Sequence, residues 1–205
     1  MRFITGLLPL VQNATGLRRV VSVLAGTFEG PIDLDNLACL GFPLLKQRDQ
    51  VAAIHTLLLE EMKRRAPSVS FVHTVPGVVK SGITRDATGF GMSVIIAISN
   101  LMSPLISTSP DESGERHVFA ATNAIYSPDH QPDHRQGVRS GTGVEVARGS
   151  NGQDGSGIYT VTHKGESSTA KEHLLDQFRK DGTAQKVWNM VDQDVQRITG
   201  SRMGA

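Results

Sequence analysis

The feature that most constrains the fold is residues 68–82, an apolar run that leads directly into a Pro-Gly pair. Val69 and Phe71 are among the β-branched and aromatic residues that strands favour. Pro76 then lacks a backbone donor and Gly77 permits a positive φ, so strand pairing must end there. Because open α/β sheets bind ligands beyond the carboxyl ends of their strands, this turn is a candidate ligand site. A purely structural turn is the alternative interpretation.

The segments around this strand alternate between helical and strand patterns. A helix is expected over residues 2–14, a strand over 17–25, and a long helix over 46–65 that ends before Pro67. Both strands are nearly continuous in apolar residues, which is typical of strands covered on two faces. The order helix, strand, helix, strand predicts a parallel α/β sheet with right-handed crossovers.

The rest of the chain predicts further helices. An apolar helix is expected over residues 90–103, and Ser109 is placed to cap the amino end of another. Two helices are expected at the carboxyl end, over residues 169–180 and 183–199, separated by Gly182. The last helix carries an apolar stripe that should dock on the body of the domain: Trp188, Val191, Val195 and Ile198.

Residues 123–168 differ in composition from the remainder. Seven of the 21 glycines fall within a stretch of 21 residues, mixed with Ser, Asn and Asp. We interpret the segment as an irregular surface insertion with two short strands, over residues 144–147 and 158–162. The expected organisation is one domain, with an α/β core at 1–122, the glycine-rich insertion, and carboxyl-terminal helices at 169–205.

Composition limits the class of protein. A chain of 205 residues suits one well-cored domain. The 21 basic and 20 acidic residues nearly balance, which argues against a nucleic-acid partner, and no apolar run reaches the ~20 residues that span a bilayer. The single Cys39 cannot form an internal disulfide, so a reducing, cytoplasmic location is expected. Residues 1–11 loosely resemble a signal peptide, which leaves secretion as the alternative.

Familiar catalytic and phosphate-binding motifs are not found in the sequence. It contains no Gly-x-Gly-x-x-Gly, no P-loop and no Gly-x-Ser-x-Gly. His130 and His134 could be metal ligands, but a solvated loop is the ordinary explanation, and no metal site is predicted. His55 and His73 have apolar neighbours and are expected to be hydrogen-bonded structural residues. Cys39 has no context that would activate a thiol.

Five segments spread over the chain nevertheless resemble one family. They are residues 2–9, 19–26, 71–81, 112–122 and 186–188. Together they are similar to the C-terminal portion of a short-chain dehydrogenase/reductase, in a divergent fungal branch common in secondary-metabolite pathways. The resemblance implies an incomplete Rossmann-type parallel sheet with flanking helices. It also implies that the glycine-rich half, which binds the dinucleotide pyrophosphate, has no counterpart in this sequence.

The resemblance also implies candidate site residues. The family uses a serine, a tyrosine and a lysine four residues after the tyrosine, but this chain has no Tyr-x-x-x-Lys, and Phe42 stands where that tyrosine would fall. Ser22 is the nearest hydroxyl to the family serine, and Lys46 is the corresponding lysine. The expected cofactor is NADP or NAD, and its expected contacts are Pro76, Gly77 and Ser81.

The resulting expectation is an oxidoreductase that interconverts a carbonyl and an alcohol on a small-molecule substrate. The alternatives are a non-catalytic binding or scaffold subunit of the same family, and a truncated, inactive product. Neither a nucleic acid nor a membrane is an expected partner. A parallel sheet that lacks its neighbouring strands would expose an edge, so pairing with the same or another chain through that edge is expected.

Overall fold

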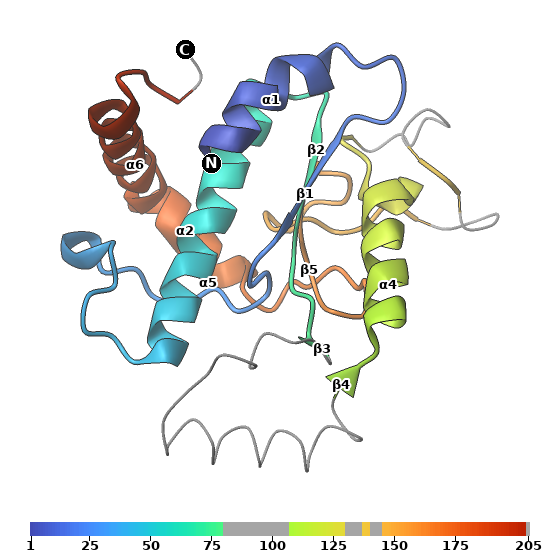
Figure 1. Cartoon of the computed structure of the whole chain (residues 1–205), viewed down its shortest axis with the longest axis horizontal. Coiled ribbons are helices and arrows are strands. Elements are labelled where there is room, and N and C mark those ends of the chain that lie inside the picture. The colour runs from blue at the N-terminus through green and yellow to red at the C-terminus, as the bar shows by residue number, and fades with distance from the viewer. Residues whose placement is uncertain (80–106, 130–136, 140–144, 204–205) are drawn as a thin grey trace.

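The computed structural model describes residues 1–79, 107–129, 137–139 and 145–203 (Figure 1). The predicted helix over residues 90–103 lies outside these ranges. The described elements are α1 (Arg2–Gln12), β1 (Arg19–Val23), α2 (Leu44–Arg65), β2 (Ser70–Thr74), β3 (Val78–Val79), β4 (Ser107–Thr108), α4 (Pro110–Thr122), β5 (Ile158–Val161), α5 (Glu172–Lys180) and α6 (Thr183–Thr199), with single 3₁₀ turns at Leu34–Asn36 and Ala124–Tyr126.

A three-stranded parallel sheet with the order β1-β2-β5 forms the centre of the fold. Val21 of β1 lies beside Val72 of β2, which in turn lies beside Tyr159 of β5. All five residues of β2 are buried, as the apolar pattern of that strand predicts. The parallel α/β arrangement is therefore confirmed, and it is consistent with a Rossmann-like fold. β1 lies at the edge of this sheet and pairs, among the described strands, with β2 alone.

Helices cover both faces of the sheet (Figure 1). Alternate residues of a strand point to opposite faces. Phe71 belongs to a buried cluster with Leu59 and Met62 of α2, whereas Val72 belongs to another with Ala120 of α4. Thus α2 and α4 pack on opposite faces, and this is the layer structure that a parallel sheet requires.

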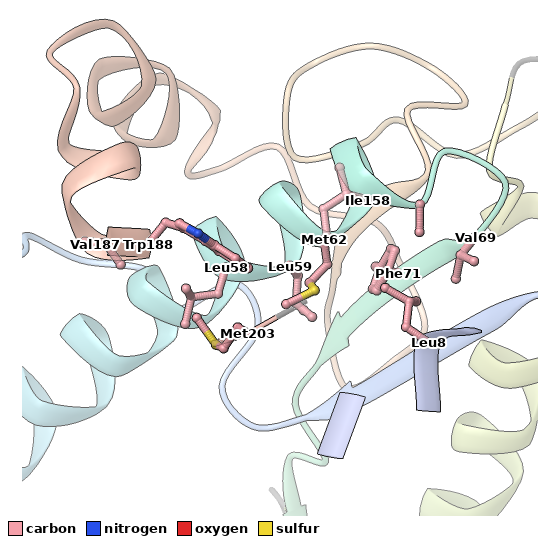
Figure 2. Packing of buried hydrophobic residues seen from close by; sticks show 11 residues of the cluster. Leu8, Leu58, Leu59, Met62, Val69, Phe71, Ile158, Val187, Trp188 and Met203 are labelled. Atoms are coloured by element: carbon pink, nitrogen blue, oxygen red, sulfur yellow. The ribbon is translucent and has the colours of Figure 1, made fainter. Parts of the chain in front are cut away.

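The larger cluster joins α1, α2 and α6 to the sheet (Figure 2). Leu59, Met62 and Phe71 are at most 1% exposed, and Trp188 of α6 packs against the same cluster. The stripe on α6 docks as predicted through Trp188, with Val191 and Val195 packed beside it. The prediction for its last residue is wrong, because Ile198 is 72% exposed.

Residues 158–161 correct the interpretation of the glycine-rich segment. They form a strand as predicted, but this strand is β5, fully buried and paired with β2 rather than lying at the surface. Residues 145–147 do not form the other predicted strand, and Val144 lies outside the described residues. Gly157 sits before β5 with φ +74, where a Cβ would come within 2.4 Å of Lys63 Cε. The division at residues 122 and 168 stays a prediction.

The helix ends follow the sequence signals closely. Ser109 caps α4, since its side chain accepts a hydrogen bond from the Glu112 amide. Gly182, with φ +78, separates α5 from α6. Of the helices in the described ranges, none is long and apolar enough to cross a membrane.

Candidate functional site

The carboxyl ends of β1, β2 and β5 lie at one edge of the sheet, because the three strands are parallel. At this edge β2 is followed by Pro76 and Gly77, the turn singled out in the sequence. Gly77 has φ +74, and a Cβ there would come within 2.9 Å of the His163 Cβ. A side chain at position 77 would therefore displace the segment that follows β5. The segments that follow β2 and β5 therefore lie in contact at this edge of the sheet.

Ser22, the penultimate residue of β1, contacts a histidine of α2. Its Oγ lies 2.6 Å from His55 Nε2. The two residues are predicted separately, Ser22 as a catalytic group implied by the resemblance and His55 as a structural histidine. Their contact could not be predicted, because it joins an edge strand to the fourth turn of α2, and the two residues are 33 positions apart in the sequence. A hydroxyl held against an imidazole can exchange a proton with it.

A second polar group lies buried beside this pair and consists of Glu29, Thr56 and His73. The Thr56 hydroxyl donates to Glu29 Oε1 at 2.8 Å and is 2.8 Å from His73 Nδ1. All three residues are 0% exposed. The His73 ring also meets the His55 ring edge-on, with centroids 4.8 Å apart. His73 is the hydrogen-bonded structural histidine that its apolar strand predicts.

The hydrogen bonds define which nitrogen of His73 carries the proton. The Ala25 amide donates to His73 Nε2 at 3.3 Å, so Nε2 must be an acceptor. Nδ1 then carries the hydrogen and donates to Thr56 Oγ1, which is free to donate its own hydrogen to Glu29. His73 is therefore a neutral imidazole linked through one hydroxyl to a carboxyl group.

Burial favours the neutral form of all three titratable groups of the site, His55, His73 and Glu29. It lowers the pKa of His55 to about 4, with the nearby positive amino terminus contributing, and that of His73 to about 3, with His55 contributing. Burial also raises the pKa of Glu29, against the opposing effect of its hydrogen bond from Thr56. Both histidines are thus neutral at physiological pH.

The structure does not bring Lys46 to Ser22. Lys46 is exposed in the first turn of α2, and its Nζ lies 3.5 Å from the centroid of the Phe42 ring. It precedes His55 by nine residues, which corresponds to about 13.5 Å along the helix axis. Lys46 is therefore not part of the Ser22–His55 pair. Ser81, the third expected cofactor contact, lies outside the described residues.

Both tyrosines are committed to the fold. Tyr126 and Tyr159 are 0% exposed, and their hydroxyls donate to the carbonyl oxygens of Gly165 and Ser127. Burial raises the pKa of Tyr126 to about 12 and also raises that of Tyr159. Neither tyrosine is placed to transfer a proton to a substrate. The sequence has no Tyr-x-x-x-Lys, and neither buried tyrosine takes the place of the catalytic tyrosine of that motif.

Within the described residues, no group of three or more His, Cys, Asp or Glu side chains could hold a metal ion. His130 and His134 lie outside those residues. Cys39 is buried at 6% exposure and accepts a hydrogen bond from Gln50 Nε2 at 3.3 Å. A buried thiol with this environment is structural.

The residues at the carboxyl edge match a dinucleotide cofactor only in part. The Pro76-Gly77 turn brings the main chain to the edge, and a pocket of about 10 Å³ lies beside it, lined partly by Thr74, Arg116 and His163. That volume holds about one water molecule, not a nicotinamide ring. No described helix follows a strand through a glycine-rich turn, and α4, which does follow a strand, carries acids in its first turn. The described residues do not form the cofactor's pyrophosphate site.

Fold and site together define a Rossmann-like α/β domain, and comparison with known proteins gives its relatives. An oxidoreductase of Emericella nidulans is 36% identical over 205 residues, which cover 96% of this chain and 60% of the relative. An NmrA-like family domain-containing oxidoreductase of an Aspergillus species is 34% identical, covering 94% of this chain and 53% of the relative. A short-chain dehydrogenase/reductase of Stachybotrys chartarum is 25% identical, covering 92% and 53%.

The chain thus spans between about half and 60% of the length of these curated relatives. No family model matches the chain, and no solved structure matches it. The relatives are fungal proteins named as oxidoreductases or dehydrogenase/reductases, which agrees with the general class that the sequence predicts.

Proposed function

We propose that this chain takes part in NAD(P)-linked interconversion of a carbonyl and an alcohol, in a fungal secondary-metabolite pathway. The observation that carries the proposal is the contact between Ser22 Oγ and His55 Nε2 at the carboxyl end of β1. A hydroxyl and an imidazole in contact near the edge where parallel α/β sheets receive their ligands support a role in proton transfer. The names of the three relatives support the redox class.

The pair is suited to removing a proton from a substrate alcohol. The Ser22 hydroxyl can donate to His55 Nε2 and simultaneously accept a hydrogen bond from a substrate hydroxyl. As the substrate loses its proton to Ser22, the Ser22 proton passes to His55. With a pKa of about 4, His55 is unprotonated throughout the physiological pH range and has room for this proton. A bound nicotinamide would supply hydride acceptance. The Pro76-Gly77 turn is the proposed contact for that end of the cofactor.

The competing proposal is a non-catalytic subunit that binds a partner through the edge of the sheet. Two observations favour it. β1 pairs on one side only among the described strands, and α1 presents Phe3 and Leu10 to solvent at 79% and 69% exposure. An open strand edge and an exposed apolar helix are features that other chains can cover. Under this proposal the same fold would associate without redox chemistry.

Turnover by single-site variants separates the two proposals. Purified protein is assayed with NADPH or NADH and a panel of small aldehydes and ketones, and with NADP⁺ or NAD⁺ and the matching alcohols. Ser22→Ala and His55→Gln should each lower turnover by about 10²–10⁴-fold, the usual contribution of general acid–base catalysis. His173→Gln changes an exposed histidine of α5 and should leave turnover intact.

Absence of turnover on every substrate, by a folded protein, would favour the binding subunit. In that case sedimentation should reveal an oligomer, or a complex with another chain, that Phe3→Ser and Leu10→Ser weaken.

A further inference from the structure

Residues 24–30 lie directly over the carboxyl ends of β1 and β2 and form the segment called here the 24–30 loop. The Leu24 amide donates to the Thr74 carbonyl at 2.9 Å, and the Gly30 amide donates to the Asp49 carbonyl at 2.9 Å. Gly26 is so close to β2 that a Cβ would lie 2.2 Å from the His73 carbonyl oxygen. The loop therefore covers the sheet edge where the candidate site lies.

Glu29 attaches this loop to the interior. Its side chain is 0% exposed, and Oε1 accepts hydrogen bonds from the Thr56 hydroxyl at 2.8 Å and the Thr27 amide at 3.3 Å. Oε2 is buried without a hydrogen-bond partner. Thr27 has φ +78, a backbone conformation that residues other than glycine seldom adopt. The structure around Thr27 must therefore hold it in this conformation. One carboxyl group thus joins the loop to α2.

The surroundings of Glu29 offer little to a negative charge. His73 Nδ1 of β2 lies 3.7 Å away, but His73 is neutral, and so is His55 of α2 behind it. Lys171, just before α5, acts only through a longer-range attraction. Asp49 of α2, which binds the loop through its main chain, has its own side chain paired with Arg48. A buried carboxylate without a close cation is costly, and a buried carboxylic acid costs much less.

We infer that Glu29 is a proton-operated latch, which holds the 24–30 loop over the sheet edge while neutral and releases it on ionisation. Its consequence for the Ser22–His55 pair rests on the proposed function, since the loop lies at the same edge of the sheet. The direction follows from the raised pKa of Glu29. The stabilisation that the neutral acid provides is complete at pH values below the ordinary glutamate pKa of 4.5. It is lost as the pH rises through the raised folded value, so the loop opens toward higher pH.

Amide hydrogen exchange measured by mass spectrometry tests the latch. Exchange of residues 24–30 is compared between the wild-type protein and Glu29→Gln at equal pH, so that the intrinsic exchange rate cancels. As the pH rises above 4.5, the wild-type to variant ratio should increase by up to about tenfold per pH unit, the limit for release of one proton. Glu112→Gln, which alters an exposed acid of α4, should show the wild-type profile.

The wild-type protein alone provides a second test, should Glu29→Gln fail to fold. The ratio of exchange in residues 24–30 to exchange in β5 should rise with pH over the same interval. A ratio that stays flat, or equal acceleration in β5, would overturn the inference, because the first shows no local opening and the second shows general unfolding. An unchanged pH dependence in a folded Glu29→Gln protein would overturn it as well.

Discussion

Replacing Thr56 by valine tests the buried polar group most sharply. Valine has nearly the shape of threonine, so the packing at this 0% exposed position is preserved while the hydroxyl is lost. Glu29 Oε1 loses its 2.8 Å hydrogen bond and His73 Nδ1 loses its partner at the same distance. Glu29 Oε1 keeps its 3.3 Å hydrogen bond from the Thr27 amide, so only His73 Nδ1 is left unsatisfied, which costs about 1–3 kcal/mol. With about 1 kcal/mol for the lost bond to Glu29, Thr56→Val should lower the free energy of unfolding by about 2–4 kcal/mol.

Thr56→Ser is the matched control. It retains the hydroxyl and removes one buried methyl group, at a cost of about 1 kcal/mol. Urea unfolding followed by circular dichroism gives both free energies of unfolding. The reasoning is refuted if the two variants differ by less than about 0.5 kcal/mol, because the hydroxyl would then contribute nothing beyond its packing.

Three further predictions follow from single features. Gly157→Ala should lower the free energy of unfolding by at least about 2 kcal/mol, because Ala at φ +74 is strained and its Cβ would lie 2.7 Å from the Pro128 carbonyl oxygen. Gly41→Ala, at φ +72 in open space, should cost only about 1 kcal/mol in the same urea titration. Alcohol oxidation, followed as nicotinamide reduction, should fall as the pH drops toward about 4, since protonated His55 cannot accept a proton; a rate that is independent of pH there would remove His55 from the chemistry. Cys39, at 6% exposure, should react with a thiol reagent much more slowly in the native protein than in denaturant, and equal rates would contradict its buried position.

The main elements could be predicted because each signal is local. The apolar run that forms β2, the serine cap of α4 and Gly182 before α6 all act within a few residues of the structure they determine. The sequence predicts a strand at β5 but not that it is buried. Its neighbours are rich in glycine and polar residues, and its burial depends on pairing with β2, almost 90 residues earlier.

The site could be predicted only in fragments. Ser22 and the Pro76-Gly77 turn stand out in the sequence, yet the contact with His55 depends on how α2 crosses the sheet. Glu29 gave no signal, because a glutamate between Phe28 and Gly30 in a loop is ordinarily solvated. Its role becomes visible only when Thr56 and His73 enclose it. Lys46 is the lysine that the family resemblance implies, but it lies two to three helical turns from His55.

Isothermal titration of the purified chain with NADPH and with NADH tests the central claim, a nicotinamide-linked function at the carboxyl edge of this sheet. The account predicts binding of one of the two with a dissociation constant of about 100 μM or tighter, which corresponds to about 5.5 kcal/mol. The Gly77→Ala variant should bind more weakly, because φ +74 and the contact with His163 both disfavour a side chain there. No binding of either nucleotide at millimolar concentration, by a protein that is demonstrably folded, would contradict the redox function for this chain.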